Sequence, residues 1–396
     1  MPTIPKADVT PPTYESTDFD PAPLAFDALG LDERLLHGIR DLGWKETRSV
    51  QSGVIPLALA GDDVIACAET GTGKTAAFLI PILQRFLGSP ASTDHASAPP
   101  GRTRALILAP TRELVVQIED QVQGLTYHTS VSSAAVYGGV PMEPQERALK
   151  AGVDIVVATP GRLMDHMRHD AADFSGLEVL VLDEADRMLD MGFLPDVQRI
   201  LSALPTTRQT LLFSATMPGE IMRLTQQFLC HPKYVQVGRR GGPAQSITHG
   251  VQTVPAGEKA KWLARWIREE SRGPVLVFCR TKVGADKLAD RLGEMGIRAI
   301  ALHADRTQQQ RQSAVEGFRT GRYPVLVATD VAARGLDIDG IAHVVNFEVP
   351  DTPEAYVHRV GRTGRADSTG TALTLVAPEE LRALRALEKA VGVQLQ

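Results

Sequence analysis

Short unbroken runs of apolar residues recur along the chain, and helix-length segments with mixed apolar and polar residues separate them. A segment of the second kind is KVGADKLADRLGEM at 282–295. Unbroken runs rich in β-branched residues that alternate with helices indicate strands buried in parallel sheets. The runs lie at 64–68, 105–109, 154–159, 179–183, 210–216, 275–279, 297–303, 325–330, 344–347 and 372–376.

These runs form two sets, which predicts an α/β protein with two domains, each a mostly parallel sheet flanked by helices. Between the sets lies GRRGGPAQS at 238–246, which we interpret as a flexible linker that follows a strand-like KYVQV. We therefore expect a first domain at 24–237 and a second at 247–396 that ends in a short amphipathic tail helix. Residues 1–23 contain six prolines and are predicted to be a disordered arm. The Gly-, Ser- and Pro-rich stretch 88–104 is predicted to be a surface loop.

The composition is that of an ordinary globular protein, with 43% hydrophobic and 22% charged residues among 396. Three separated cysteines without a CxxC pair argue against a zinc cluster or a disulfide framework. No apolar run approaches the ~20 residues that span a bilayer, and the N-terminus lacks the apolar run of a signal peptide. We expect a soluble, cytoplasmic protein with no membrane partner. The net charge of −5 implies that any phosphate-binding surface is a local groove.

A candidate nucleotide site begins at VIACAETGTGKT, residues 64–75, which is a strand followed by a Gly-rich loop and a helix start. Gly71 and Gly73 let backbone amides curl around phosphates, Lys74 would reach the β- and γ-phosphates, and the Thr75 hydroxyl would bind Mg²⁺. The strict pattern has glycine where this chain has Ala68. The alternative interpretation is a Gly-rich turn with an incidental lysine.

A second motif, VLVLDEAD at 179–186, is a buried strand that ends in carboxylates. Asp183 at the tip of the strand suits Mg²⁺, and Glu184 can polarise an attacking water. The alternative is a solvated acidic helix cap. Four apolar residues directly before the pair place it at the ligand-binding edge of a sheet, so hydrolysis of ATP or GTP is the leading hypothesis.

A third motif, HRVGRTGR at 358–365, presents three arginines in the predicted second domain, namely Arg359, Arg362 and Arg365. Such guanidinium groups can neutralise charge on a transferring γ-phosphoryl group, an effect worth about 10³–10⁵ in rate. The alternative is a patch that pairs with carboxylates or with a phosphate backbone. A triphosphate site completed by both domains would explain why the chain has two.

The motifs together resemble those of the DEAD-box ATP-dependent RNA helicases, which have two tandem RecA-like domains. The resemblance covers about residues 26–377. Within the family, the chain is most similar to the stand-alone bacterial members of the RhlE-like branch. In the family's order the chain contains AETGTGKT, PTRELVVQ (110–117), GG (138–139), TPGR (159–162), DEAD (183–186), SAT (214–216), Gln308 with Arg311, ATDVAARGLD (328–337) and HRVGRTGR.

This resemblance implies roles in binding ATP with Mg²⁺. Trp44 would stack on adenine, and Gln51 would hydrogen-bond its N6/N7 edge, whereas Thr47-Arg48 replaces the family's usual Pro-Thr. The implied nucleotide-binding residues are Phe26, Trp44, Gln51, Thr70, Gly71, Thr72, Gly73, Lys74, Thr75, Asp337, Arg362 and Arg365. The implied catalytic residues are Lys74, Asp183, Glu184, Arg362 and Arg365, with Thr75 and Asp183 toward the metal.

The resemblance also implies residues that couple hydrolysis to domain closure and residues that bind RNA through its sugar-phosphate backbone. The coupling residues are Asp186, Ser214, Thr216 and His358. The RNA-binding residues are Thr111, Arg112, Gly139, Thr159, Gly161, Arg162, Arg280, Gln308, Arg311 and Thr329.

The function that these residues predict is RNA-stimulated ATP hydrolysis with local separation of short RNA duplexes. An ATP-gated RNA clamp and a DNA helicase or translocase are the alternatives. A clamp would hold RNA through many rounds of hydrolysis, and a DNA enzyme would respond to single-stranded DNA rather than to RNA.

Overall fold

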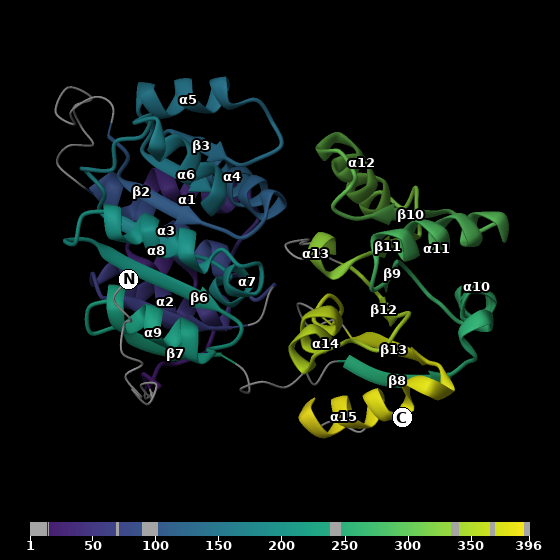
Figure 1. Cartoon of the computed structure of the whole chain (residues 1–396). Helices are drawn as coiled ribbons and strands as arrows, with labels where there is room; N and C mark the ends of the chain where they lie inside the picture. Colours follow the sequence, from purple (N-terminus) through teal and green to yellow (C-terminus); the bar gives the residue numbers. More distant parts are fainter. Residues whose placement is uncertain are drawn as a thin grey trace, which may run out of the picture. The chain divides into compact units, whose positions relative to one another are not determined.

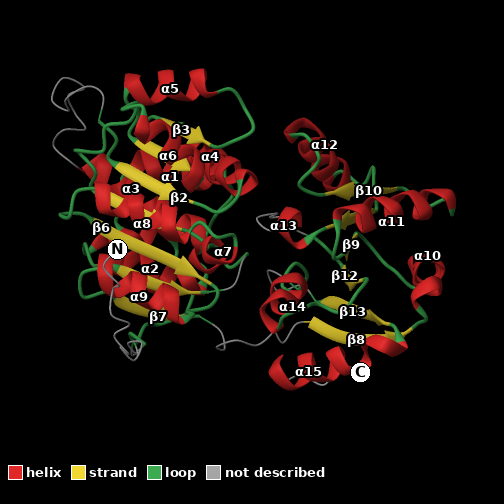
Figure 2. Cartoon of the chain, viewed as in Figure 1, coloured by secondary structure: helices red, strands yellow, loops and turns green. Residues whose placement is uncertain are grey.

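The computed structural model describes residue 14 and residues 16–68, 71–88, 102–237, 247–333, 340–364 and 369–391. These residues form two compact units, and the division falls between strands β7 (Lys233–Gln236) and β8 (Ile247–Thr253). Figures 1 and 2 show each unit as one sheet with helices on both sides. The predicted linker at 238–246 and the predicted site residues Thr70, Asp337 and Arg365 lie outside the described residues.

The sheet of the first unit has seven strands in the order β3-β4-β2-β5-β6-β1-β7, and every pairing is parallel. Alternate residues of β1 face opposite layers, with Val64 in one hydrophobic core and Ile65 in the other. The strands besides β7 are β1 (Val64–Cys67), β2 (Ala105–Leu108), β3 (Ser133–Val136), β4 (Ile155–Ala158), β5 (Val179–Leu182) and β6 (Gln209–Ser214).

Helices α1 to α4 pack on one face of this sheet, and α6 to α9 pack on the other. The 3₁₀ segment η1 spans Phe26–Leu29. The helices are α1 (Glu33–Asp41), α2 (Ser49–Leu59), α3 (Lys74–Gly88), α4 (Arg112–Thr126), α5 (Met142–Ala151), α6 (Pro160–Arg168), α7 (Ala185–Asp190), α8 (Leu194–Ala203) and α9 (Gly219–Phe228).

The sheet of the second unit has six parallel strands in the order β10-β11-β9-β12-β13-β8. Helices α10 and α11 cover one face, and α12 to α15 cover the other. The elements are η3 (Ala256–Glu258), α10 (Lys259–Glu269), β9 (Val275–Phe278), α11 (Lys282–Glu294), β10 (Ala299–Leu302), α12 (Gln308–Arg319), β11 (Val325–Ala328), α13 (Asp330–Ala333), β12 (His343–Asn346), α14 (Pro353–Val360), β13 (Gly370–Val376), η4 (Pro378–Glu380) and α15 (Leu381–Val391).

Every predicted apolar run overlaps a strand, and the fold class is confirmed. The apolar pattern did not predict β3 and β8, which lie at edges of their sheets. Edge strands have only one neighbouring strand and tolerate polar or small residues. Their sequences, SAAV and ITHGVQT, therefore carry no unbroken apolar run.

The predicted disordered arm is wrong for its last part, because Tyr14 and residues 16–23 pack on the first unit. The Tyr14 ring stacks on Tyr234 of β7 at 6.0 Å between centroids, and the Thr17 amide donates to the Tyr234 carbonyl oxygen at 2.7 Å. Phe19 packs into the core beside Gly53. This segment covers the β7 edge of the sheet, which gives the proline-rich stretch partners that its composition does not reveal.

Candidate functional site

The phosphate-binding loop follows β1 and ends at the start of α3. Gly71 and Gly73 have φ angles of +81° and +94°, a left-handed conformation that other residues rarely adopt. Lys74 is buried, and its Nζ donates to the Ala68 carbonyl oxygen at 3.0 Å. Thr75 is half-buried in the first turn of α3. The loop therefore has the backbone that a phosphate-binding turn requires, with its lysine directed back onto the loop.

The first two carboxylates of the DEAD segment, Asp183 and Glu184, lie directly after β5, the strand between β2 and β6. Asp183 is 2% exposed, and its Oδ1 accepts from the Glu184 amide at 2.9 Å. Burial raises the pKa of Asp183 to about 7, although the nearby Lys74 charge acts in the opposite direction. Glu184 forms a buried ion pair with Arg187, a partner that sequence reasoning missed.

The DEAD segment contacts the SAT segment through hydrogen bonds. The Asp186 carboxylate accepts from the Thr216 amide at 2.8 Å and from the Thr216 hydroxyl at 2.9 Å. The Ser214 hydroxyl accepts from the Asp186 amide at 3.1 Å and donates to the Thr216 carbonyl oxygen at 2.7 Å. Three of the four implied coupling residues therefore contact one another, while their coupling role stays a prediction.

The predicted base-binding residues lie near the start of α2. Gln51 is buried, and its Nε2 donates to the Gly73 carbonyl oxygen at 3.0 Å while its Oε1 accepts from the Arg48 amide at 2.8 Å. Trp44 is half-buried and lies 6.5 Å from Phe26 between ring centroids. Phe26 is 3% exposed and belongs to the core, so the structure places it as a support for Trp44 rather than as a ring open to a base.

Most predicted RNA-binding residues of the first unit gather at the carboxyl ends of the neighbouring strands β2, β3 and β4. Thr111 caps α4, accepting from the Leu114 amide at 3.3 Å, and Arg112 lies directly against Gly139. Arg162 donates to the Val140 carbonyl oxygen at 3.0 and 3.1 Å. Thr159 precedes α6 and Gly161 lies in its first turn, where a Cβ would meet nothing within 4 Å.

In the second unit, two predicted RNA-binding residues lie near the ends of β10 and β11. Arg311 donates to the His303 carbonyl oxygen at 3.4 Å, and the Thr329 amide donates to the Leu302 carbonyl oxygen at 3.3 Å. Gln308 begins α12, and its side chain is outside what the structure describes.

A neighbouring carboxylate, which sequence reasoning missed, organises the turn before α12. Asp286 binds His303 Nε2 at 2.9 Å and Arg306 Nη2 at 2.6 Å.

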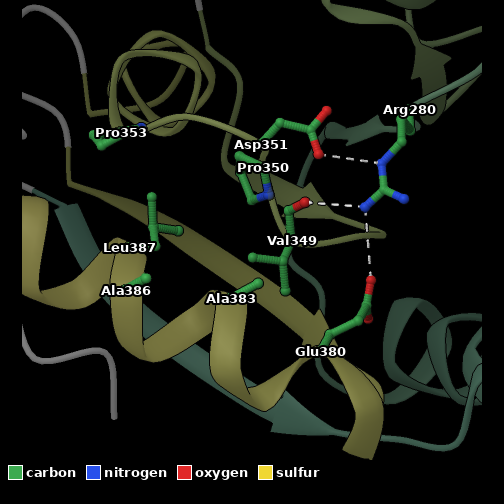
Figure 3. Close-up of a pocket in the computed structure, with 9 residues that line it drawn as sticks. All are labelled: Arg280, Val349, Pro350, Asp351, Pro353, Glu380, Ala383, Ala386 and Leu387. Atoms are coloured by element: carbon green, nitrogen blue, oxygen red, sulfur yellow. Dashed lines mark hydrogen bonds and ion pairs between the residues drawn. The ribbon is translucent and has the colours of Figure 1, made fainter.

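Arg280, a further predicted RNA-binding residue, is exposed and lies near carboxylates of its own unit. Its guanidinium lies 3.6 Å from Asp351 and 3.8 Å from Glu380, and it donates to the Val349 carbonyl oxygen at 3.4 Å (Figure 3). These groups line a pocket of about 430 Å³ beside α15. Carboxylates of the same unit therefore lie near the guanidinium, whose side chain is 49% exposed, and the RNA-binding role of Arg280 stays a prediction.

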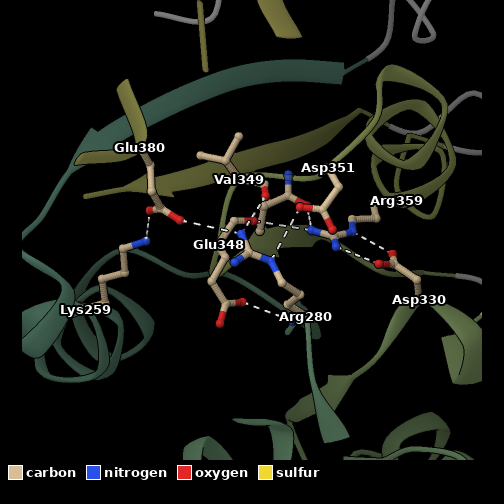
Figure 4. A network of polar contacts seen from close by, with 9 residues as sticks. Lys259, Arg280, Asp330, Glu348, Val349, Asp351, Arg359 and Glu380 are labelled. Carbon is tan, nitrogen blue, oxygen red and sulfur yellow. Dashed lines mark hydrogen bonds and ion pairs between the residues drawn. The ribbon is translucent and has the colours of Figure 1, made fainter. Parts of the chain in front are cut away.

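The arginines of HRVGRTGR differ in their surroundings. Arg359 is buried and pairs with both Asp330 oxygens at 2.6 and 2.7 Å, and it donates to Asn346 at 3.1 Å (Figure 4). It therefore holds α14 against the sheet, in agreement with the carboxylate-pairing alternative. Arg362 is buried just beyond α14, and His358 is half-buried in the last turn of that helix.

Among the residues that the structure describes, none of the helices combines the length and the apolar character that crossing a membrane requires. The described residues also hold no group of three or more His, Cys, Asp or Glu side chains arranged to bind a metal.

Comparison with known proteins places these features in a family. The DEAD/DEAH box helicase family model matches residues 48–224, and the helicase conserved C-terminal domain model matches residues 258–367. The chain belongs to the DEAD-box helicases. This family assignment agrees with two sheets built entirely from parallel pairings, one in each unit.

Curated relatives from bacteria support the assignment. The chain is 42% identical over 371 residues to the ATP-dependent RNA helicase CshA of Listeria monocytogenes, covering 94% of this chain and 69% of that protein. It is 42% identical to the DEAD-box ATP-dependent RNA helicase CshA of Bacillus subtilis, covering 92% and 72%. These relatives are named CshA, so they do not support the expected RhlE-like branch.

Solved structures of this DEAD-box family are similar along most of the chain. S. cerevisiae Dbp5 bound to RNA and ADP BeF3 matches with a TM-score of 0.82 and 30% identity, covering 93% of each chain. Mss116p bound to single-stranded RNA and AMP-PNP matches with a TM-score of 0.84 and 28% identity, covering 97% of this chain and 81% of that chain. The tandem RecA-like fold is therefore established.

Proposed function

We propose that this DEAD-box protein is an ATP-dependent RNA helicase that binds RNA across its two units and locally separates short duplexes. The observation that carries the proposal is the arrangement of the first unit, in which a phosphate-binding loop and the Asp183–Glu184 pair both follow strands of one parallel sheet. Ligands bind at this end of such sheets. The cytoplasm, where ATP and RNA occur together, is the compartment that we propose.

For ATP hydrolysis, Lys74 would exchange the Ala68 carbonyl oxygen for the β- and γ-phosphates. Glu184 would orient the attacking water, and its Arg187 partner would hold the carboxylate in place. Each of these groups is buried, which strengthens its interaction with a charged ligand.

The oxygen donors at this site fit Mg²⁺, which prefers carboxylate, hydroxyl and phosphate oxygens. The Asp183 carboxylate and the Thr75 hydroxyl would hold the ion. Because burial raises the pKa of Asp183 to about 7, a bound cation would also stabilise its charged form. When bound, Mg²⁺ would neutralise charge on the phosphates during transfer.

We further propose that Arg362 and Arg365 of the second unit complete the triphosphate site when the two units close. RNA would be held through its backbone by the loops that carry Thr111, Arg112 and Arg162, together with Arg311 and Thr329. Each base-pair step stacks with on the order of 1.4 kcal/mol in DNA, so one closure would disturb a few pairs.

Replacement of Lys74 by Ala tests the proposal. We expect RNA-stimulated ATPase to fall at least ~100-fold, because the only described lysine of the phosphate loop is lost. Lys150→Ala is the matched control, since Lys150 is an exposed lysine paired with Glu146 on α5. The assay measures phosphate release with single-stranded RNA, duplex RNA and matched DNA.

Undiminished RNA-stimulated turnover in the Lys74 variant would refute the proposed site. Stimulation of the wild type by single-stranded DNA but not by RNA would instead identify a DNA enzyme.

A further inference from the structure

A carboxylate on α11 holds the turn that leads into α12, the helix that carries a predicted RNA-binding arginine. Asp286 Oδ1 lies 2.9 Å from His303 Nε2 and 2.6 Å from Arg306 Nη2, so one oxygen binds both side chains. His303 is 4% exposed, and its other ring nitrogen, Nδ1, has no hydrogen-bond partner in the described part of the chain. Among the described residues, Asp286 is therefore the polar group that fixes this buried ring.

The turn at 303–307 joins the two helical layers of the second unit. Ala285 places α11 in the core on one face of the sheet, whereas Ala314 places α12 in the core on the opposite face. The turn follows β10, an edge strand that pairs only with β11. A second ion pair, Lys282 with Asp305 at 2.6 Å, also joins α11 to the turn, but both side chains are more than half exposed. Exposed pairs contribute little, so the position of the turn depends mainly on Asp286.

The backbone of His303 in turn contacts the predicted RNA-binding side chain. Its carbonyl oxygen accepts from the Arg306 amide at 3.1 Å and from Arg311 Nη1 at 3.4 Å. Arg311 is half-buried in the first turn of α12. The donors of a guanidinium form a rigid planar fork, so the place of one acceptor helps to set the direction of the whole group. Asp286 thus influences, through His303, where the Arg311 guanidinium points.

Resting on the proposed RNA-binding function, we propose that Asp286 is a positioning residue for RNA, which fixes the 303–307 turn so that Arg311 meets a phosphate group. The sign of its effect separates this role from simple electrostatics. A carboxylate near RNA repels phosphates, so removal of its charge would tighten binding if charge alone mattered. Removal of a positioning group weakens binding instead.

The fluorescence anisotropy of a labelled oligouridylate, with a saturating non-hydrolysable ATP analogue, measures the RNA affinity of the full chain at several salt concentrations. We expect Asp286→Asn to weaken RNA binding about tenfold, because a charge-assisted hydrogen bond from Arg311 is lost. The plot of log K against log salt concentration should become shallower by about 0.7, which corresponds to one phosphate contact on a single strand. Asp286→Glu keeps the charge and should retain part of the affinity.

A double-mutant cycle tests whether Asp286 acts through Arg311. Arg311→Ala should weaken RNA binding by a similar factor, and the addition of Asp286→Asn to it should cause little further loss, since residues that act together are not additive. Asp290→Asn is the matched control, because Asp290 is an exposed carboxylate one turn further along α11. It should not weaken RNA binding. Affinity for the ATP analogue without RNA, together with a denaturant titration, shows that each variant is folded.

Unchanged or tighter RNA binding in Asp286→Asn would overturn the inference, as would losses that add in the double variant. If Asp286→Asn does not fold, the same cycle is run with Asp286→Glu, which should show a smaller loss that disappears in the Arg311→Ala background. An Arg311→Ala variant that binds RNA like the wild type would refute the proposed RNA-binding role of Arg311 together with the inference. A loss in Arg311→Ala without a loss in Asp286→Asn would refute the inference alone.

Discussion

Single histidines that are partly or fully removed from solvent make the stability of this protein depend on pH. His343 at the start of β12 accepts a hydrogen bond at Nε2 from the Arg272 amide at 3.0 Å. Its ring meets the Trp266 ring edge-on at 5.2 Å between centroids. Burial lowers the pKa of His343, and protonation of Nε2 would set one N–H against another.

The sign of the resulting pH dependence follows from this lowered pKa. The unfolded chain takes up the proton near pH 6.5, before the folded protein does. Stability from neutral His343 is therefore full above about pH 6.5 and declines as the pH falls toward the folded-state pKa. Burial lowers the pKa values of His249 and His166 in the same direction.

We predict that the urea midpoint of the wild type decreases when the pH is lowered from about 7.5 to about 5.5. The midpoint of the His343→Gln variant should decrease less, because the glutamine Oε1 can accept a hydrogen bond from the Arg272 amide and does not titrate. Tryptophan fluorescence reports the transition, since Trp266 contacts the ring. An identical decline in the variant would contradict a contribution from His343.

At the scale of elements, one buried lysine joins four segments of the second unit. Lys259 at the start of α10 is 3% exposed. Its Nζ donates to the Phe347 carbonyl oxygen at 3.0 Å and to the Leu375 carbonyl oxygen at 2.9 Å. It also donates to Glu380 at 2.6 Å, as Figure 4 shows. Glu380 also accepts from the Ala377 amide at 2.9 Å. The lysine thus ties the ends of β12 and β13 to η4 and the tail helix α15.

We predict that Glu380→Gln lowers the free energy of unfolding by about 3 kcal/mol, because it leaves a buried ammonium without its counter-charge. Glu258→Gln is the control. Glu258 pairs with Lys261 at 3.4 Å, both side chains are exposed, and such pairs contribute about 0–1 kcal/mol. Denaturant titration measures both variants. A double variant, Lys259→Met with Glu380→Leu, should recover part of the loss, and equal effects of the two single variants would contradict the prediction.

For the whole molecule, the proposed mechanism requires that ATP and RNA stabilise the same conformation. Two ligands that favour one state must increase each other's affinity by the same factor. We expect a non-hydrolysable ATP analogue to tighten RNA binding by about 5- to 150-fold, and RNA to tighten the analogue equally.

The fluorescence anisotropy of a labelled single-stranded RNA measures the affinity for RNA with and without the ATP analogue. Titration with the analogue, at zero and at saturating RNA, measures the affinity for the analogue. Affinities that do not depend on the other ligand would show that the two sites act separately.

The sequence by itself determined the parallel strands, the phosphate-binding loop and the DEAD carboxylates. These features are contiguous in the chain, and buried strands or left-handed turns restrict which residues can occupy them. Even the contact between Asp186 and Thr216 follows from two short motifs on adjacent strand ends.

Only the tertiary structure decided which partner each polar side chain takes. Arg280 pairs with Glu380, Arg359 pairs with Asp330, and Gln51 binds the Gly73 carbonyl oxygen. These partners lie 22 to 100 residues apart in the chain. The packing of residues 16–23 on β7 was hidden for the same reason. Which groups meet depends on how strands and helices stack, and no local pattern records that arrangement.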